Sequence, residues 1–83
     1  MFERAIFSAR LKELIQRQNM TYAQLAQVLG VSTAQVSDMA NGKAGTSMER
    51  LYKLCQTFEV SADYLLGLTD EPRPLVSEKK EEE

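Results

Sequence analysis

Apolar residues return every three or four positions along most of this chain, a spacing typical of the buried face of an α-helix. No segment alternates apolar and polar residues with the period of two that is typical of half-buried strands. The pattern therefore predicts an all-α fold of five helices in a single domain. We expect them from about Glu3 to Gln18, from about Tyr22 to Leu29, from Ser32 to about Asn41, from Thr46 or Ser47 through Phe58, and between Ser61 and Gly67.

The predicted helix boundaries coincide with residues that cap helices. Three pairs have the spacing of a capping box, in which each side chain bonds to the backbone of the other residue: Thr21 with Gln24, Ser32 with Gln35, and Thr46 with Glu49. Ser61 is expected to cap the fifth helix. Gly30 and Gly67 stand where two helices should end, and glycine tolerates the left-handed backbone found at such ends.

Two helices carry clear apolar stripes and are expected to supply much of the core. The stripe of the first helix consists of Ile6, Phe7, Leu11, Leu14 and Ile15, and that of the fourth consists of Met48, Leu51, Leu54, Cys55 and Phe58. Cys55 is interpreted as a small core residue, with a redox-sensing thiol as the alternative. Tyr64, Leu65 and Leu66 belong either to the core or to a dimer interface.

Residues 21–43 have the pattern of two short helices joined by a short, tight turn. Such a joint needs a small residue where the helices cross, which Ala26 provides, and a positive φ in the turn, which Gly30 tolerates. It also needs an apolar cluster, which is supplied by Leu25, Leu29, Val31, Val36 and Met39. This combination predicts a helix-turn-helix, in which the second helix enters the major groove of DNA.

The sequence TYAQLAQVLGVSTAQVSDMANGK at 21–43 resembles the helix-turn-helix of the Cro/cI-type, or XRE-like, phage repressors. RLKELIQRQNMT before it and SMERLYKLCQTFEVSADYLLG after it are similar to the same family, so the resemblance covers about 10–67. It implies a five-helix, lambda-repressor-like DNA-binding domain over 1–70. Residues 71–83 are charged and low in complexity, and we expect a disordered tail there.

The resemblance also implies roles for individual residues of the third helix and its neighbours. The helix that begins at Ser32, itself part of the interface, would lie in the major groove. The bases would face Thr33, Ala34, Ser37 and Asp38, and Gln35 either joins them or is occupied by its capping box. Phosphates would be contacted by Tyr22, Asn41, Lys43 and the cap at Thr46 or Ser47, which would position the protein without reading sequence.

Several positions depart from the pattern common in that family or keep a second interpretation. Many members have glutamine where this chain has Tyr22, whose ring either donates one hydrogen bond to a phosphate or packs on a neighbour. Asp38 either accepts from the amino group of cytosine or belongs to a solvated face. A common Arg–Glu pair is replaced by Ile15 and Ala40, which leaves no orphaned charge. The basic residues interpreted as solvated helix faces are Arg10, Lys12, Arg50 and Lys53.

Charge and composition change this picture in two ways. The 83 residues have a net charge of −2: seven basic and seven acidic residues balance in the body of the chain, residues 1–70, and the acidic excess lies from Glu71 on. That body is less basic than most nucleic-acid-binding surfaces. The chain has no histidine, one cysteine and hence no internal disulfide. Without a metal-ligand cluster, paired carboxylates or a glycine-rich phosphate loop, we expect no enzyme, cofactor, metal site or small-molecule ligand.

The leading hypothesis is therefore a sequence-specific DNA-binding regulator of transcription, most simply a repressor that binds a palindromic operator in double-stranded DNA as a homodimer. The alternative is a protein-interaction or antitoxin-like module that keeps the fold, which the near-neutral body and Asp38 favour. No apolar run is long enough to cross a membrane, and the amino terminus does not have the pattern of a signal peptide. We expect a cytoplasmic protein of bacterial or phage origin.

Overall fold

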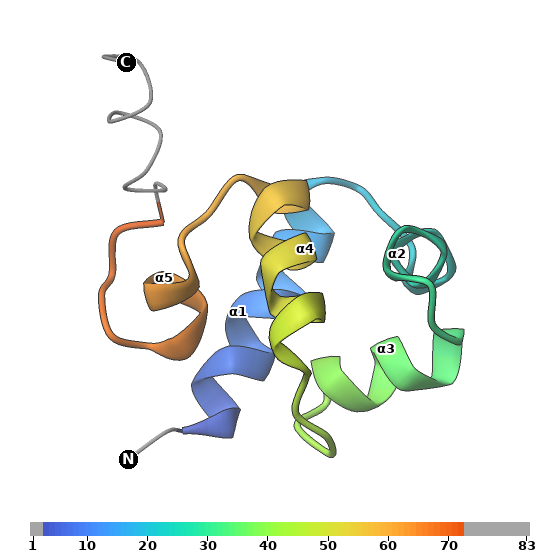
Figure 1. The fold of residues 1–83 in the computed structure, drawn as a ribbon, viewed down its shortest axis with the longest axis horizontal. Helices are drawn as coiled ribbons and strands as arrows, with labels where there is room; N and C mark the ends of the chain where they lie inside the picture. The colour runs from blue at the N-terminus through green and yellow to red at the C-terminus, as the bar shows by residue number, and fades with distance from the viewer. Residues whose placement is uncertain (1–2, 73–83) are drawn as a thin grey trace.

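Five helices and their connections make up residues 3–72, the part of the chain that the computed structural model describes (Figure 1). They are α1 (Arg4–Arg17), α2 (Tyr22–Leu29), α3 (Thr33–Ala40), α4 (Met48–Phe58) and α5 (Ala62–Leu66). This range contains no strand, so the predicted all-α fold of five helices is confirmed. None of these helices is both long and apolar enough to cross a membrane. The predicted tail, 71–83, lies outside the described residues except for its first two.

The starts of α2 and α5 are set by the predicted capping residues. At α2 the Thr21 Oγ1 accepts the Gln24 N–H at 3.0 Å, and the Gln24 Oε1 accepts the Thr21 N–H at 2.8 Å. At α5 the Ser61 Oγ accepts the Tyr64 N–H at 3.1 Å. These bonds satisfy backbone donors that the first turn of a helix would otherwise leave unpaired.

The start of α4 differs from the prediction. Ser47 is the capping residue, and its Oγ accepts the Arg50 N–H at 3.2 Å. Because Glu49 is then only the second residue of the helix, the predicted capping box between Thr46 and Glu49 is wrong. The third position, from which a box is closed, holds an arginine, whose side chain can only donate hydrogen bonds.

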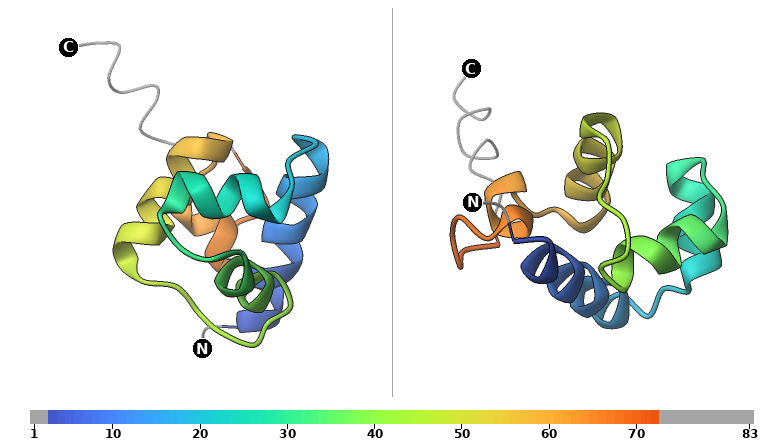
Figure 2. Two further views of the ribbon diagram at one scale, coloured as in Figure 1. Left: turned by 90° about the vertical axis from the view of Figure 1, so that its right-hand side faces the viewer. Right: turned by 90° about the horizontal axis from the view of Figure 1, so that it is seen from below.

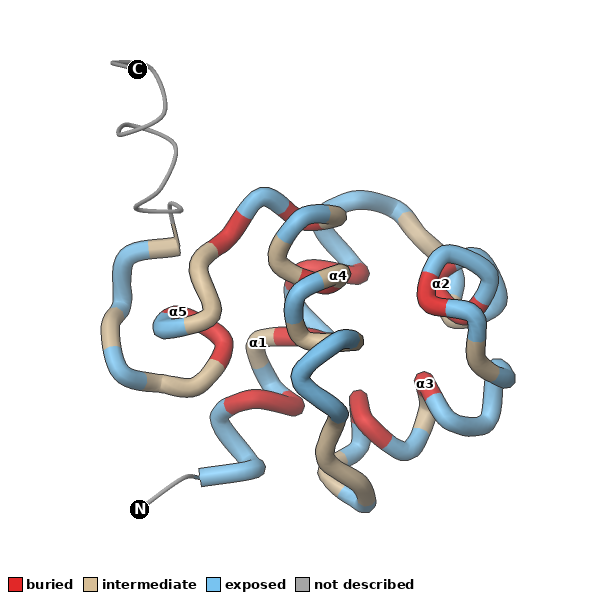
Figure 3. Tube along the Cα trace, in the orientation of Figure 1, coloured by how far each residue is buried: buried red, intermediate tan, exposed pale blue. Residues whose placement is uncertain are grey.

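The core lies where the inner faces of the five helices meet (Figure 3). α1 packs against α3 and α5, α2 packs against α3 and α4, and α4 also contacts α5. The largest fully buried side chains come from every helix and are Phe7, Leu11, Leu25, Val36, Met39, Leu54 and Leu65. Ile15 and Ala40 are buried as well, as expected for two apolar residues that replace an ion pair. Each large apolar side chain buried here stabilises the fold by about 1.5–3 kcal/mol.

Both predicted apolar stripes are correct over most of their length and wrong at one end. Met48 is 81% exposed, because it lies about 120° around α4 from Leu54. Ile6 is 37% exposed at the edge of its stripe, where it lies against Gly67. A Cβ atom at Gly67 would stand 3.0 Å from Ile6 Cγ2, so glycine lets the end of α5 approach α1. Cys55 is half-buried against the core, and burial raises the pKa of its thiol.

α2 and α3 form the predicted helix-turn-helix. Gly30 ends α2 with a left-handed backbone at φ 73°, and the Val31 N–H donates to the Ala26 carbonyl at 3.0 Å. Ala26 is 4% exposed, as expected for the small residue of the joint. Only 30–32 separate the two helices, so the turn leaves their relative orientation little freedom.

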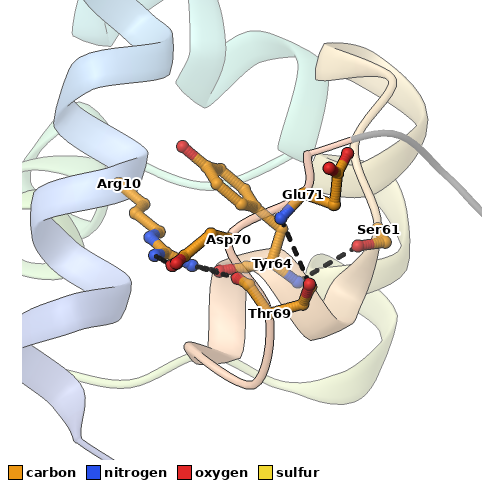
Figure 4. A network of polar contacts seen from close by, with 6 residues as sticks. All are labelled: Arg10, Ser61, Tyr64, Thr69, Asp70 and Glu71. Carbon is orange, nitrogen blue, oxygen red and sulfur yellow. Dashed lines mark hydrogen bonds and ion pairs between the residues drawn. The ribbon is translucent and has the colours of Figure 1, made fainter.

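Arg10 ties the end of the domain to α1 (Figure 4). Its guanidinium donates to the Tyr64 carbonyl, to the Thr69 carbonyl at 2.7 Å and to the Asp70 carboxylate at 3.0 Å. It also lies 4.2 Å from the centroid of the Tyr64 ring, in a cation–π arrangement. Its side chain is only 21% exposed, so the interpretation of Arg10 as part of a solvated helix face is wrong. Its partners are 54 to 60 residues away along the chain, beyond the reach of local sequence patterns.

Replacing Arg10 with alanine should lower the free energy of unfolding by about 2 kcal/mol, because two carbonyls lose their donor and the Tyr64 ring loses its cation. Arg17→Ala is the matched control. It removes only an exposed ion pair with Glu13 at 2.9 Å and should cost less than about 0.5 kcal/mol. Urea unfolding followed by circular dichroism measures both, and equal losses in the two variants would contradict the anchoring role of Arg10.

Candidate nucleic-acid interface

α3 turns one side to the core and the other to solvent (Figure 3). Its inward side is formed by Val36, Met39 and Ala40, each at most 1% exposed. The exposed residues at its start and along its outer side are Ser32, Thr33, Ala34, Gln35 and Asp38, and Ser37 is half-buried. Ala34 and Asp38 are one turn apart and lie opposite Val36, at the centre of the outer side. The structure thus brings the predicted base-facing residues together on one accessible surface.

Gln35 is held by the capping box at the start of α3. Its Oε1 accepts the Ser32 N–H at 2.9 Å, and the Ser32 Oγ accepts the Gln35 N–H at 3.1 Å. The capping role that the sequence predicts for this pair is confirmed. The Gln35 amide nitrogen makes no hydrogen bond within residues 3–72, and it remains a donor beside the outer side of α3.

Three further polar side chains of this surface differ in how far they are already bonded. Asn41 Nδ2 donates to Ser37 Oγ at 3.2 Å, so these two side chains hold each other across one helical turn. In the described part of the chain, by contrast, the Thr33 hydroxyl and the Asp38 carboxylate have no hydrogen-bond partner. Both groups can therefore bond to a ligand without first breaking a bond within the protein.

The loop after α3 carries positive charge to the same surface. The backbone N–H groups of Lys43 and Ala44 donate to the Asp38 carbonyl at 2.8 and 3.3 Å, which holds the loop against the end of α3. Arg4, in the first turn of α1, donates from Nη1 to the Lys43 carbonyl at 3.5 Å. The start of α1, this loop and α3 lie along the lower edge of the molecule in Figure 1, and the right-hand view of Figure 2 looks at that edge from below. Two exposed cations are thus neighbours beside α3.

Arg4 is a candidate site residue that the sequence reasoning missed. It precedes Lys43 by 39 residues, and no motif connects the two. Its placement depends on how α1 packs against α3, which is a property of the folded chain. In the sequence, one feature sets Arg4 apart: it is a positive charge in the first turn of a helix, where the helix dipole does not stabilise it.

Two predicted phosphate contacts lie at the starts of neighbouring helices. Tyr22, the first residue of α2, is half-buried against the core, and its hydroxyl has no hydrogen bond within residues 3–72. The ring therefore packs on its neighbours and still leaves a donor. At α4 the Thr46 Oγ1 is buried and has no partner among the described residues, whereas Ser47 is exposed. Of the two residues proposed for this cap, only Ser47 is accessible to a phosphate.

Positive charge is sparse on this surface. Lys43 and Arg4 are exposed there, and the half-buried Arg50 follows in the first turn of α4, but Asp38 and Glu49 oppose them. Contact with an anionic ligand would therefore depend on few cations and on backbone N–H groups at helix starts, whose dipoles favour negative charge.

Comparison with known proteins gives a family match over most of the described residues. Residues 11–65 match the helix-turn-helix family model, a range that contains α2, α3 and α4 entirely. YobD of Bacillus subtilis (strain 168), an uncharacterized HTH-type transcriptional regulator, is 31% identical over 74 residues. The matched region is 89% of this chain but only 66% of YobD, so YobD is substantially longer.

Several solved structures share the fold. The P22 c2 repressor protein, solved in complex with the synthetic operator 9T, has a TM-score of 0.69 and 25% identity, covering 72% of this chain and 91% of that one. A transcriptional regulator from Listeria innocua has a TM-score of 0.73 and 28% identity, covering 89% and 69%. The clp gene regulator ClgR from C. glutamicum has a TM-score of 0.66 and 25% identity, covering 76% and 82%.

Replacing Gln35 with alanine should lower the free energy of unfolding by about 1 kcal/mol, because the Ser32 N–H loses its acceptor. Thr33→Ala is the control, since it changes the same exposed turn without removing a hydrogen bond and should alter stability by less than about 0.5 kcal/mol. Thermal unfolding followed by circular dichroism compares the two variants. If Gln35→Ala is as stable as Thr33→Ala, the capping box does not hold the start of α3.

Proposed function

We propose that this chain, which belongs to the helix-turn-helix family, is a sequence-specific DNA-binding regulator of transcription that places α3 in the major groove. The bases face Thr33, Ala34, Ser37 and Asp38, with Ser32 and Gln35 at the helix start beside them. The phosphates are contacted by Tyr22, Asn41, Lys43 and Ser47, and by Arg4. The relatives named as regulators, and the likeness to a repressor solved with its operator, support this proposal.

The observation that carries the proposal is the free outer side of α3. A helix that packs with one side and leaves polar groups unbonded on the other is suited to reading base edges, which offer hydrogen-bond donors and acceptors. Thr33 and Asp38 have such groups, and the Gln35 amide adds a donor. The capped starts of α2, α3 and α4 supply N–H groups for the phosphates on either side.

We further propose that the protein binds a palindromic operator as a homodimer. α3 has eight residues and reaches only a few base pairs, and one protomer brings few cations to the phosphates. Two copies related by a twofold axis would double both contributions. Their half-sites would then lie about 34–36 Å apart, one turn of DNA.

Repression is the simplest consequence of such binding, because a dimer seated on an operator excludes other proteins from the same DNA. The likeness to the P22 c2 repressor supports this direction of regulation. A protein that works on operators acts where the DNA is, which for a bacterial or phage regulator is the cytoplasm.

Replacing Thr33 with alanine should weaken binding of the dimer to the preferred duplex about ten- to a hundredfold, because one base in each half-site loses a hydrogen bond. The preferred duplex is obtained by repeated selection from a random pool, and affinity is measured by fluorescence anisotropy. Gln56→Ala, on α4, is the control and should bind as the unaltered protein does. Unchanged affinity for Thr33→Ala would remove this residue from the interface.

Failure of the unaltered protein to bind any duplex at low salt would favour the protein-interaction module instead.

Affinity should fall with salt as expected for about four to eight phosphate contacts per dimer, which corresponds to a slope of log affinity against log salt between about −4 and −7. Lys43→Ala should reduce the magnitude of this slope by about 2 per dimer and weaken binding to all sequences alike. Lys53→Ala removes the same charge from α4 and should leave the slope unchanged. A salt slope that is identical in the Lys43 and Lys53 variants would show that Lys43 does not contact phosphate.

A further inference from the structure

Asp38 is unusual in being a free carboxylate at the centre of the surface proposed to meet DNA. It is exposed, it lies opposite Val36 on α3, and its backbone carbonyl is fixed by two N–H groups of the following loop. The ion pairs found within residues 3–72 are Arg10 with Asp70 and Arg17 with Glu13, so no cation neutralises the Asp38 side chain there.

A carboxylate in the major groove faces a specific physical constraint. It lies between two rows of phosphates, which repel it, and it can only accept hydrogen bonds. Among the base edges, guanine presents two acceptors, and thymine presents an acceptor and a methyl group. Adenine has an amino donor, but its N7 acceptor lies beside it. The amino group of cytosine is the donor that a carboxylate meets without an adjacent acceptor on the same base.

The local structure allows this short side chain to reach a base edge. Ala34, one turn before Asp38 on the same side of α3, has no atom beyond Cβ, and no lysine or arginine occurs between 33 and 40. A bulky or cationic residue at 34 would hold the helix away from the bases or draw it toward a guanine. With alanine there, the helix can approach closely enough for a carboxylate two bonds from the backbone.

We propose that Asp38 makes the protein select a cytosine at one position of each half-site, by accepting a hydrogen bond from its N4 amino group. This inference rests on the proposed function. The same carboxylate disfavours guanine and thymine at that position, because each places an acceptor where the amino donor of cytosine would stand, and it lowers affinity for DNA of unrelated sequence. Asp38 is thus a specificity residue whose removal should strengthen non-specific binding while weakening discrimination.

The test begins with the duplex selected by the unaltered protein from a random pool. At each selected cytosine, a duplex is made with 2-pyrimidinone, which lacks the N4 amino group. We expect one position per half-site at which this change weakens binding of the unaltered protein about tenfold or more. At the same position it should weaken binding of the Asp38→Ala variant less than about twofold. Asp38→Asn should move the preference at the same position toward adenine, which asparagine recognises through N6 and N7.

Asp63→Asn is the matched control for charge. Asp63 is exposed in the first turn of α5, at the other end of the molecule from α3 (Figure 1). The Asp63→Asn variant should keep the cytosine preference. Its binding to unrelated DNA should be unchanged, whereas that of the Asp38→Asn variant should be stronger. Circular dichroism of each variant checks that the fold is retained.

The outcomes separate this inference from the proposed function. If the unaltered protein selects a site but no cytosine shows a loss that depends on Asp38, the inference is overturned and the DNA-binding function stands. If the unaltered protein selects no duplex at all, both are overturned. A tenfold loss at one cytosine that disappears in Asp38→Ala supports the inference.

Discussion

The tight joint between α2 and α3 is the constraint on which the rest of the interface depends. Gly30 turns the chain with a left-handed backbone, and the Val31 N–H bonds back to the Ala26 carbonyl. The capping box of Ser32 and Gln35 then starts α3 at once. The joint is too short to let α3 rotate relative to α2. The burial of Val36 on one side of α3 therefore decides which residues are exposed on the other side. A looser turn would let α3 rotate and would mix core and interface residues.

A second constraint is how the protein uses its cations. Arg10 is committed to the carbonyls and the aromatic ring of the α5 region, so a residue that looks available for DNA stabilises the domain instead. With the body neutral, the proposed interface relies on Lys43, Arg4 and helix starts. This sparse charge fits a protein that gains affinity by pairing two copies and gains selectivity from uncharged or acidic side chains. It also means that salt should weaken binding only moderately for a DNA-binding dimer.

Most of the fold could be predicted because its signals are local. A capping box joins residues three apart, and a glycine stop or an apolar stripe lies within one helix, so the five helices and the joint followed from the sequence. The errors have other causes. Met48 was wrongly assigned to the core because it lies about 120° around α4 from Leu54, at the edge of the apolar stripe. The roles of Arg10 and Arg4 depend on partners 39 or more residues away along the chain. The base-facing residues were named from a family resemblance. The structure shows where they lie, and their contacts with DNA stay a prediction.

A nuclear magnetic resonance titration of the isotope-labelled protein with its selected duplex shows directly whether the outer side of α3 and the adjoining loop meet the DNA. If they do, the largest amide shift changes will occur at 32–43 and in the first turns of α2 and α4, with small changes in α5. Large changes centred on α5 or on the outer side of α4 around Tyr52, with α3 unaffected, would contradict this placement of the DNA.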